Sequence, residues 1–158
     1  MEVKVERPPN FERILEVFPR AREFGVIFAY GDTIYNPSGV GIPTPLRVHE
    51  EVHGKRQRGA GVDAWWDAYL TDPAFRFTEE LKAHVAEYNA RVTLSTDRYA
   101  AARLKAETAR RLIAPLYAYG LAQPSFQEAL NAIQTELVEV RSLGLKHFDP
   151  TLYEHPMA

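Results

Sequence analysis

The chain of 158 residues contains no cysteine. This absence excludes a disulfide framework, an iron–sulfur cluster, a thiol nucleophile and every zinc module that is built on cysteine. Any metal ion must therefore be bound by histidine, aspartate or glutamate side chains. The chain has five histidines and 21 acidic residues that could take this role.

The sequence also lacks a long apolar run and an excess of one charge. Its longest apolar stretch, Val26–Tyr30, is far shorter than the ~20 residues of a membrane-spanning helix. Residues 1–10 carry charges and have no apolar segment of the kind that a signal peptide needs. The formal net charge is -2, which argues against a nucleic-acid-binding surface. We therefore expect a cytoplasmic protein that binds neither nucleic acid nor membrane.

Length and composition are those of one globular domain. Hydrophobic residues make up 46% of the chain and charged residues 25%, as in ordinary soluble domains, and a single domain commonly holds about 100–200 residues. We predict one domain over residues 1–158. Within it we expect a core at 24–93, a helical extension at 97–143 and an irregular tail at 144–158.

Local patterns predict an α+β, mainly α fold. The β-rich run Phe24–Tyr30, the turn Gly31-Asp32 and the run Thr33–Asn36 predict a β-hairpin, and the alternation of Val3 and Val5 predicts a short strand before it. Apolar spacing and capping residues predict helices at about 10–18, 44–57, 62–70, 72–92, 97–119 with a kink at Pro115, and 125–143. Asn10 and Thr44 are expected to be N-caps, and Ser125 with Glu128 a capping box.

The helix predicted at 44–57 carries the motif HEEVH, an HExxH, at residues 49–53. His49 and His53 lie one helical turn apart on the same face, so both imidazoles can reach one metal ion. A zinc ion bound in this way needs a third protein ligand and keeps a fourth position open for water. Glu50 is placed to act as the general base that activates this zinc-bound water.

Helical geometry places the motif on the inward side of its helix. At about 100° per residue, four charged residues share one narrow stripe, which we interpret as the solvated face: Arg47, Glu51, Lys55 and Arg58. His49, Glu50 and His53 lie on the opposite side. Because unpaired polar groups are costly to bury, this placement favours a metal site over a solvated helix with incidental histidines.

The third ligand is expected on the helix that contains Phe75–Tyr88. Its apolar stripe consists of Phe77, Leu81, Val85, Tyr88 and Val92. Glu79 lies nearly opposite that stripe and is predicted to be solvated, whereas Glu80 and His84 lie one turn apart at its flank. We therefore choose Glu80 as the third ligand. His84 is either a partner of a ligand or an alternative ligand.

The motif and the glutamate helix resemble the gluzincin clan of zinc metallopeptidases, and more closely the minigluzincins and small phage-type HExxH proteins. The matching pieces are AYGDTIYNPSG (29–39), HEEVHGKRQ (49–57), GVDAWWDAYLTDPAFR (61–76) and EELKAH (79–84). The resemblance covers roughly Phe24–Asn89 and does not reach the C-terminal third. It implies a minimal zincin-like fold, in which a small sheet lies over the active-site helix and its edge strand binds an extended peptide or protein substrate.

Two aspects of the expected site differ from the family or remain open. Thermolysin-like members have an aspartate four residues after the ligand glutamate, where it hydrogen-bonds the first ligand histidine. This sequence has His84 there, which brings no negative charge. The electrophile that stabilises the oxyanion of a tetrahedral intermediate is also open, with Tyr35, Tyr88, Arg76 and His84 as candidates.

The sequence thus predicts a hydrolase, a zinc metallopeptidase whose metal ligands are His49, His53 and Glu80. One alternative is a non-catalytic, zinc-stabilised accessory protein that acts through protein–protein contacts, and another is a helical interaction module without metal. The intact Glu50 favours the enzyme, because a purely structural site needs no base. The remaining aromatic and histidine residues of interest are expected to be core residues (Trp65, Trp66 and Tyr69) or solvated residues of the tail (His147 and His155).

Overall fold

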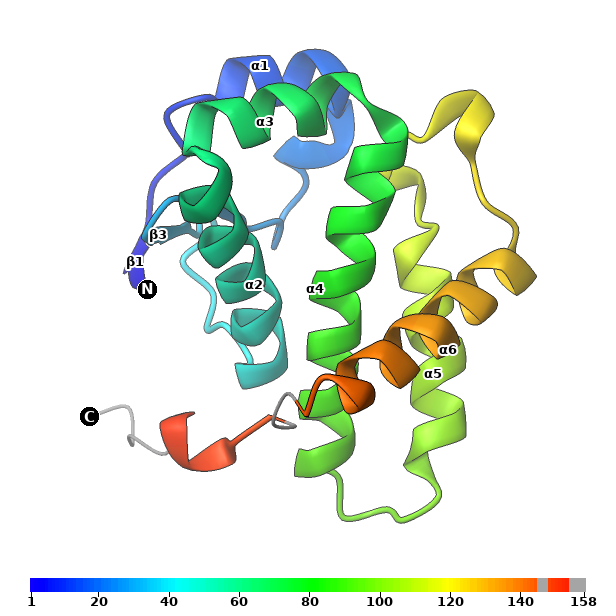
Figure 1. The fold of residues 1–158 in the computed structure, drawn as a ribbon. Helices are drawn as coiled ribbons and strands as arrows, with labels where there is room; N and C mark the ends of the chain where they lie inside the picture. Colours follow the sequence, from blue (N-terminus) through cyan, green and yellow to red (C-terminus); the bar gives the residue numbers. More distant parts are fainter. Residues whose placement is uncertain (145–147, 154–158) are drawn as a thin grey trace.

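The computed structural model describes residues 1–144 and 148–153 (Figure 1). His147 and His155, which we expect to be solvated, lie outside this part of the chain. The strands are β1 (Glu2–Lys4), β2 (Phe28–Tyr30) and β3 (Thr33–Tyr35). The α-helices are α1 (Phe11–Val17), α2 (Thr44–Ala60), α3 (Val62–Thr71), α4 (Pro73–Leu94), α5 (Ala100–Leu112) and α6 (Phe126–Ser142). Short 3₁₀ helices are η1 (Pro19–Arg22), η2 (Pro115–Tyr117), η3 (Gly120–Ala122) and η4 (Pro150–Tyr153). The fold is therefore α+β and mainly α-helical, as predicted.

The small sheet has the strand order β1-β3-β2. β2 and β3 form the predicted antiparallel hairpin, and β1 pairs with β3 in parallel. The hairpin is shorter than the sequence suggests, because Phe24 lies outside it and is 82% exposed. β2 is an edge strand and is attached to α2 by Gln57, whose side chain donates to the Ala29 carbonyl (2.9 Å) and accepts from the Gly31 amide (2.8 Å). These two bonds fix the sheet against the helix that carries the HExxH motif.

Helices α2 and α4 lie side by side, and α3 connects them across one end (Figure 1). The start of α4 is fixed by Asp72, whose carboxylate accepts hydrogen bonds from the amides of Ala74 (2.9 Å) and Phe75 (3.3 Å). This cap and Pro73 in the first turn are the signals that a helix start requires. The opposite side of α4 is covered by α5 and α6.

Two hydrophobic clusters flank this arrangement. The first joins α1, η1, β2 and α3 and is built around Phe11, Ile14, Phe18, Phe28, Trp65, Trp66, Tyr69 and Leu70. The second joins α4, α5 and α6 through Val85, Tyr88, Leu104, Leu112, Ile133 and Leu137. The first cluster includes residues of β2 and α3, which contact α2, and the second packs on α4. The interface between α2 and α4 lies outside both clusters and can carry polar side chains.

Several predicted helix ends differ from the structure. The helix expected to continue to residue 119 ends at Leu112, because the residue before Pro115 is extended and cannot continue a helix. The N-cap of α2 is Pro43, which places Thr44 inside the helix. Asn10 precedes α1 but makes no capping hydrogen bond through its side chain. The capping box of Ser125 and Glu128 is confirmed, with both reciprocal bonds present.

No helix among residues 1–144 and 148–153 combines the length and the apolar character needed to cross a membrane.

Candidate metal centre

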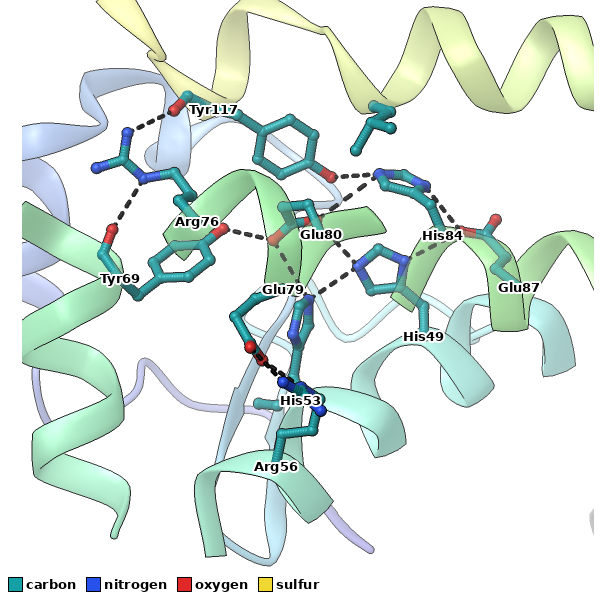
Figure 2. Close-up of polar contacts among 12 residues, drawn as sticks. His49, His53, Arg56, Tyr69, Arg76, Glu79, Glu80, His84, Glu87 and Tyr117 are labelled. Atoms are coloured by element: carbon teal, nitrogen blue, oxygen red, sulfur yellow. Dashed lines mark hydrogen bonds and ion pairs between the residues drawn. The ribbon is translucent and has the colours of Figure 1, made fainter. Parts of the chain in front are cut away.

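His49, His53 and Glu80 meet at the interface of α2 and α4, as predicted (Figure 2). The Nε2 atoms of the two histidines lie 3.2 Å apart. Glu80 Oε2 lies 3.4 Å from His49 Nε2, and Glu80 Oε1 lies 3.3 Å from His53 Nε2. All three side chains are buried, with at most 5% of each residue exposed. The three donor groups are therefore largely withdrawn from bulk water and line one cavity.

The size of this cluster fits a tetrahedral metal ion. Bonds of about 2.0–2.1 Å with tetrahedral angles place neighbouring ligand atoms about 3.3 Å apart. The separation of the two Nε2 atoms is close to this value, and so is the distance from each Nε2 to its nearer Glu80 oxygen, Oε2 for His49 and Oε1 for His53. Glu80 Oε2 is also buried without a hydrogen-bond partner among the described residues. A buried carboxylate oxygen in that state is costly unless something pairs with it. The cluster could thus hold a metal ion.

Glu50 is buried next to the two histidines and lines the same cavity. Burial raises the pKa of its carboxyl group, although the charges of His49 and His53 and a backbone hydrogen bond from Ala29 act in the opposite direction. A general base works best when its pKa is close to the working pH. The environment of Glu50 is therefore suited to accepting and returning a proton.

The distal nitrogen of His49 faces a second carboxylate, Glu87. His49 Nδ1 lies 3.2 Å from Glu87 Oε2, an ion-pair distance, although neither atom has a hydrogen-bond partner among the described residues. Burial alone would raise the pKa of Glu87, but its contacts with His49 and Arg111 outweigh burial and lower the pKa to about 2. Glu87 is therefore ionised at neutral pH. A carboxylate in this place fixes the orientation of a ligand histidine and increases its basicity.

Glu87 supplies, next to His49 Nδ1, the negative charge that His84 does not bring. His84 occupies the position four residues after Glu80, whereas the carboxylate lies seven residues after Glu80, two turns along the same face of α4. The spacing is a signal that the sequence does contain. The carboxylate is paired with Arg111 of α5, so the C-terminal third of the chain also supports the centre.

Replacing Glu87 by glutamine is expected to weaken metal binding by about 10–100-fold, the usual effect of losing such an outer partner. The change keeps the shape of the side chain and removes its charge. Competition with a chromogenic chelator measures the affinity. Glu107→Gln is the matched control, because Glu107 forms exposed ion pairs with Arg91 and Arg103 on the same side of the molecule and should leave the affinity unchanged. Equal affinities of the Glu87 variant and the wild type would contradict a role for this carboxylate.

His84 is buried among the ligands and is held by the C-terminal third. Its Nε2 lies 2.9 Å from the hydroxyl of Tyr117 and 3.7 Å from Glu80 Oε2. Burial and the charge of His49 lower its pKa to about 3, so the imidazole is neutral. His49, His84 and Glu87 form a second group of potential metal ligands. The Arg111 guanidinium on Glu87 makes that second group less favourable for a cation.

Tyr69 holds the candidate ligand Glu80 in place. Its hydroxyl donates to Glu80 Oε1 at 2.5 Å. Burial and the Glu80 charge raise the pKa of this hydroxyl well above 10, so it remains a donor. Trp65, Trp66 and Tyr69 are buried, as we predicted for core aromatics. No pattern in the sequence indicates that Tyr69 also binds the carboxylate of Glu80.

Our prediction that Glu79 is solvated is wrong. Only 1% of Glu79 is exposed, and its carboxylate accepts two hydrogen bonds from Arg56 (2.5 and 2.6 Å) and one from Trp65 Nε1 (2.9 Å). The helical wheel of α4 alone could not show this, because Arg56 comes from α2 and Trp65 from α3. The indole of Trp65 in turn packs edge-on against the ring of His53. Glu79 therefore joins three helices around the centre.

Three of the four side chains that we considered as electrophiles have other roles. Arg76 is 2% exposed and donates to the backbone carbonyls of four residues: Tyr69, Leu70, Tyr117 and Ala118. The Tyr88 hydroxyl donates to the Ala101 carbonyl and belongs to the second cluster. Tyr35 ends β3 and packs against the first cluster. His84 alone of the four lies beside the ligands.

Tyr117 is a better placed donor that the sequence did not reveal. It lies in η2, lines the cavity together with Glu50 and the three candidate ligands, and contacts His84 through its hydroxyl (Figure 2). Burial and the charge of Glu80 raise its pKa well above 10, so the hydroxyl keeps its proton. Because Tyr117 reaches the site only through the packing of the C-terminal third, no local pattern points to it.

The cavity at the centre has a volume of about 270 Å³. Its lining includes the polar residues just described and apolar residues of α1, η1, the segment before β2, and α3. The arrangement thus combines a possible metal site, a buried carboxylate, a hydroxyl donor and a space in which a substrate can lie.

No protein-family model, curated protein or solved structure matches this chain.

Proposed function

We propose that the protein is a zinc-dependent metallopeptidase of gluzincin type, in which His49, His53 and Glu80 bind the ion and Glu50 is the general base. The observation that carries the proposal is the buried cluster of His49 Nε2, His53 Nε2 and the Glu80 carboxylate beside Glu50, with separations of 3.2–3.4 Å between these groups. The resemblance of HEEVH and the EELKAH segment to gluzincins, which rests on the same residues, agrees with it.

The donor set favours zinc in a catalytic rather than a structural role. Two imidazoles and one carboxylate, without thiolates, make up a ligand set known from zinc peptidases. Structural zinc sites usually have four protein ligands, whereas catalytic sites have three and keep one position for water or substrate. Bound zinc supplies a Lewis acid that polarises a carbonyl group and lowers the pKa of water to about 7.

The residues of the chain have separate tasks in peptide hydrolysis. Glu50 accepts the proton of the attacking water and returns it to the leaving amine, so that one water is consumed and the carboxylate is regenerated. Tyr69 and Glu87 hold Glu80 and His49 in their orientations. Tyr117 offers a hydroxyl to the oxyanion that develops on the substrate carbonyl.

Removal of Tyr117's hydroxyl tests the last of these tasks. Tyr117→Phe is expected to lower kcat by about 10²–10³-fold, the usual effect of losing one oxyanion donor, while KM and zinc content change little. The control is Tyr119→Phe, because the Tyr119 hydroxyl donates to the Leu112 carbonyl and does not line the cavity. A Tyr117→Phe variant with unchanged kcat would remove this residue from the reaction.

Removal and return of zinc test the function as a whole. Zinc-loaded protein is incubated with a library of peptides, and new termini are identified by mass spectrometry. We expect cleavage by the zinc-loaded protein, none after chelation and dialysis, and recovery with one equivalent of zinc. If zinc binds but no peptide is cleaved under any condition, the protein is instead the zinc-stabilised binding protein that the sequence left as an alternative.

A further inference from the structure

The cavity has an apolar wall that zinc binding and proton transfer by Glu50 do not require. The wall consists of Ile14, Phe18, Ala21, Val26, Trp65 and Trp66. The charged residues of the cavity, Glu50, Glu80 and Arg111, lie among the residues around the metal centre. The cavity is therefore divided into a polar part, where the chemistry takes place, and an apolar part.

Half of this wall comes from a part of the chain that the gluzincin resemblance does not cover. Ile14 lies in α1 and Ala21 in η1, before the matching region begins at Phe24. Figure 1 shows α1 running beside α3. The first hydrophobic cluster joins these segments, so the wall is a fixed part of the core.

The wall is connected to the candidate ligands through aromatic contacts. The rings of Phe18 and Tyr69 lie 5.8 Å apart, and those of Trp65 and Tyr69 are stacked at 4.8 Å. Tyr69 binds Glu80, and Trp65 packs against His53. A group in the apolar part thus lies directly beside the metal centre.

The properties of the apolar part select its occupant. Among the residues that form the wall none is charged, so it offers no ion pair to an acidic or basic group. The whole cavity, at about 270 Å³, is slightly smaller than the roughly 300–1,000 Å³ of pockets that enclose drug-sized ligands. It suits one large aliphatic or aromatic side chain, whose transfer from water is favourable in proportion to its apolar area.

We propose that the N-terminal segment 14–26 and α3 form a specificity pocket for one large apolar side chain of the peptide substrate, next to the bond that is cleaved. That the bound peptide is a substrate rests on the proposed function, but the preference of the pocket for an apolar side chain can be measured without turnover. Both tryptophans of the chain line the cavity, so their fluorescence reports its occupancy directly.

The experiment uses zinc-loaded Glu50→Gln protein and two blocked tetrapeptides, one of four alanines and one with leucine at the third position. Titration followed by tryptophan emission gives the two dissociation constants. We expect the leucine peptide to bind at least about 10-fold more tightly, since even one methylene group in an apolar pocket is worth about 10–200-fold. Equal affinities would overturn the proposal.

A second variant locates the preference in the wall. Val26→Phe, introduced into the same protein, fills part of the pocket and is expected to reduce the ratio of the two affinities to about threefold or less. The same substitution at Val138, which is 55% exposed on α6, should leave the ratio unchanged. Val26→Leu provides a milder filling if the phenylalanine variant does not fold. An unchanged ratio in a folded, zinc-loaded Val26 variant would contradict the proposed pocket.

The outcomes separate this proposal from the proposed function. If the wild type cleaves no peptide but the leucine peptide binds with the expected preference, the pocket stands and the hydrolytic function fails. If the wild type cleaves peptides while the two tetrapeptides bind equally, the function stands and the pocket fails.

Discussion

Replacing Glu50 by glutamine is expected to abolish peptide cleavage while the zinc content stays at one equivalent. Glutamine has the same shape but cannot accept the proton of the attacking water. General-base catalysis contributes about 10²–10⁴-fold, so we expect kcat/KM to fall by about 10²–10⁴-fold. The carboxylate has little access to water that could replace it, because only 6% of Glu50 is exposed.

The neighbouring Glu51 gives a matched control on the same helix. Its carboxylate faces away from the cavity and pairs with Arg47 on the outer side of α2. Glu51→Gln should therefore keep both zinc and activity. Cleavage by Glu50→Gln at the wild-type rate would remove Glu50 from the reaction, and loss of zinc from this variant would show that Glu50 has a different role in the site.

Replacing His49 by alanine is expected to remove zinc and most of the stability that zinc provides. His49 contributes Nε2 to the ligand cluster and Nδ1 to the contact with Glu87. At a free zinc concentration about 1,000-fold above the dissociation constant, binding stabilises the folded state by about 4 kcal/mol. For a chain of this length that corresponds to a shift of roughly 8–16 °C in Tm.

Thermal unfolding with zinc and with chelator measures this effect. The wild type should show the shift, and His49→Ala should unfold at the same temperature under both conditions. His84→Asn serves as the control, because His84 lies beside the ligand cluster without being one of its members. A full zinc-dependent shift in His49→Ala would contradict the ligand assignment, and its loss in His84→Asn would place His84 among the ligands.

The elements that the sequence predicts well depend on local rules. HEEVH places His49 and His53 one turn apart whatever surrounds them, and the inward face of α2 follows from its charged stripe. The hairpin and the capping box are likewise determined within a few residues. Glu80 could be predicted as the third ligand because the apolar stripe of α4 indicates which residues lie at its flank.

The remaining parts of the site depend on contacts between distant segments. Glu79 is buried because Arg56 and Trp65 approach it from other helices, which the pattern of α4 cannot show. Tyr117 and Arg111 reach the centre only after α5 has packed against α4. Glu87 is the exception, because its spacing of two turns from Glu80 was present in the sequence.

Zinc-edge X-ray absorption of the purified, zinc-loaded protein tests the central claim most directly. We predict one zinc ion with four ligands, two imidazole nitrogens and two oxygens, at distances of about 2.0–2.2 Å. The purified His53→Ala variant should give no zinc signal, because it lacks one of the three proposed ligands, as does His49→Ala. A spectrum with six oxygen ligands and no imidazole scattering would contradict the claim that His49, His53 and Glu80 bind the ion.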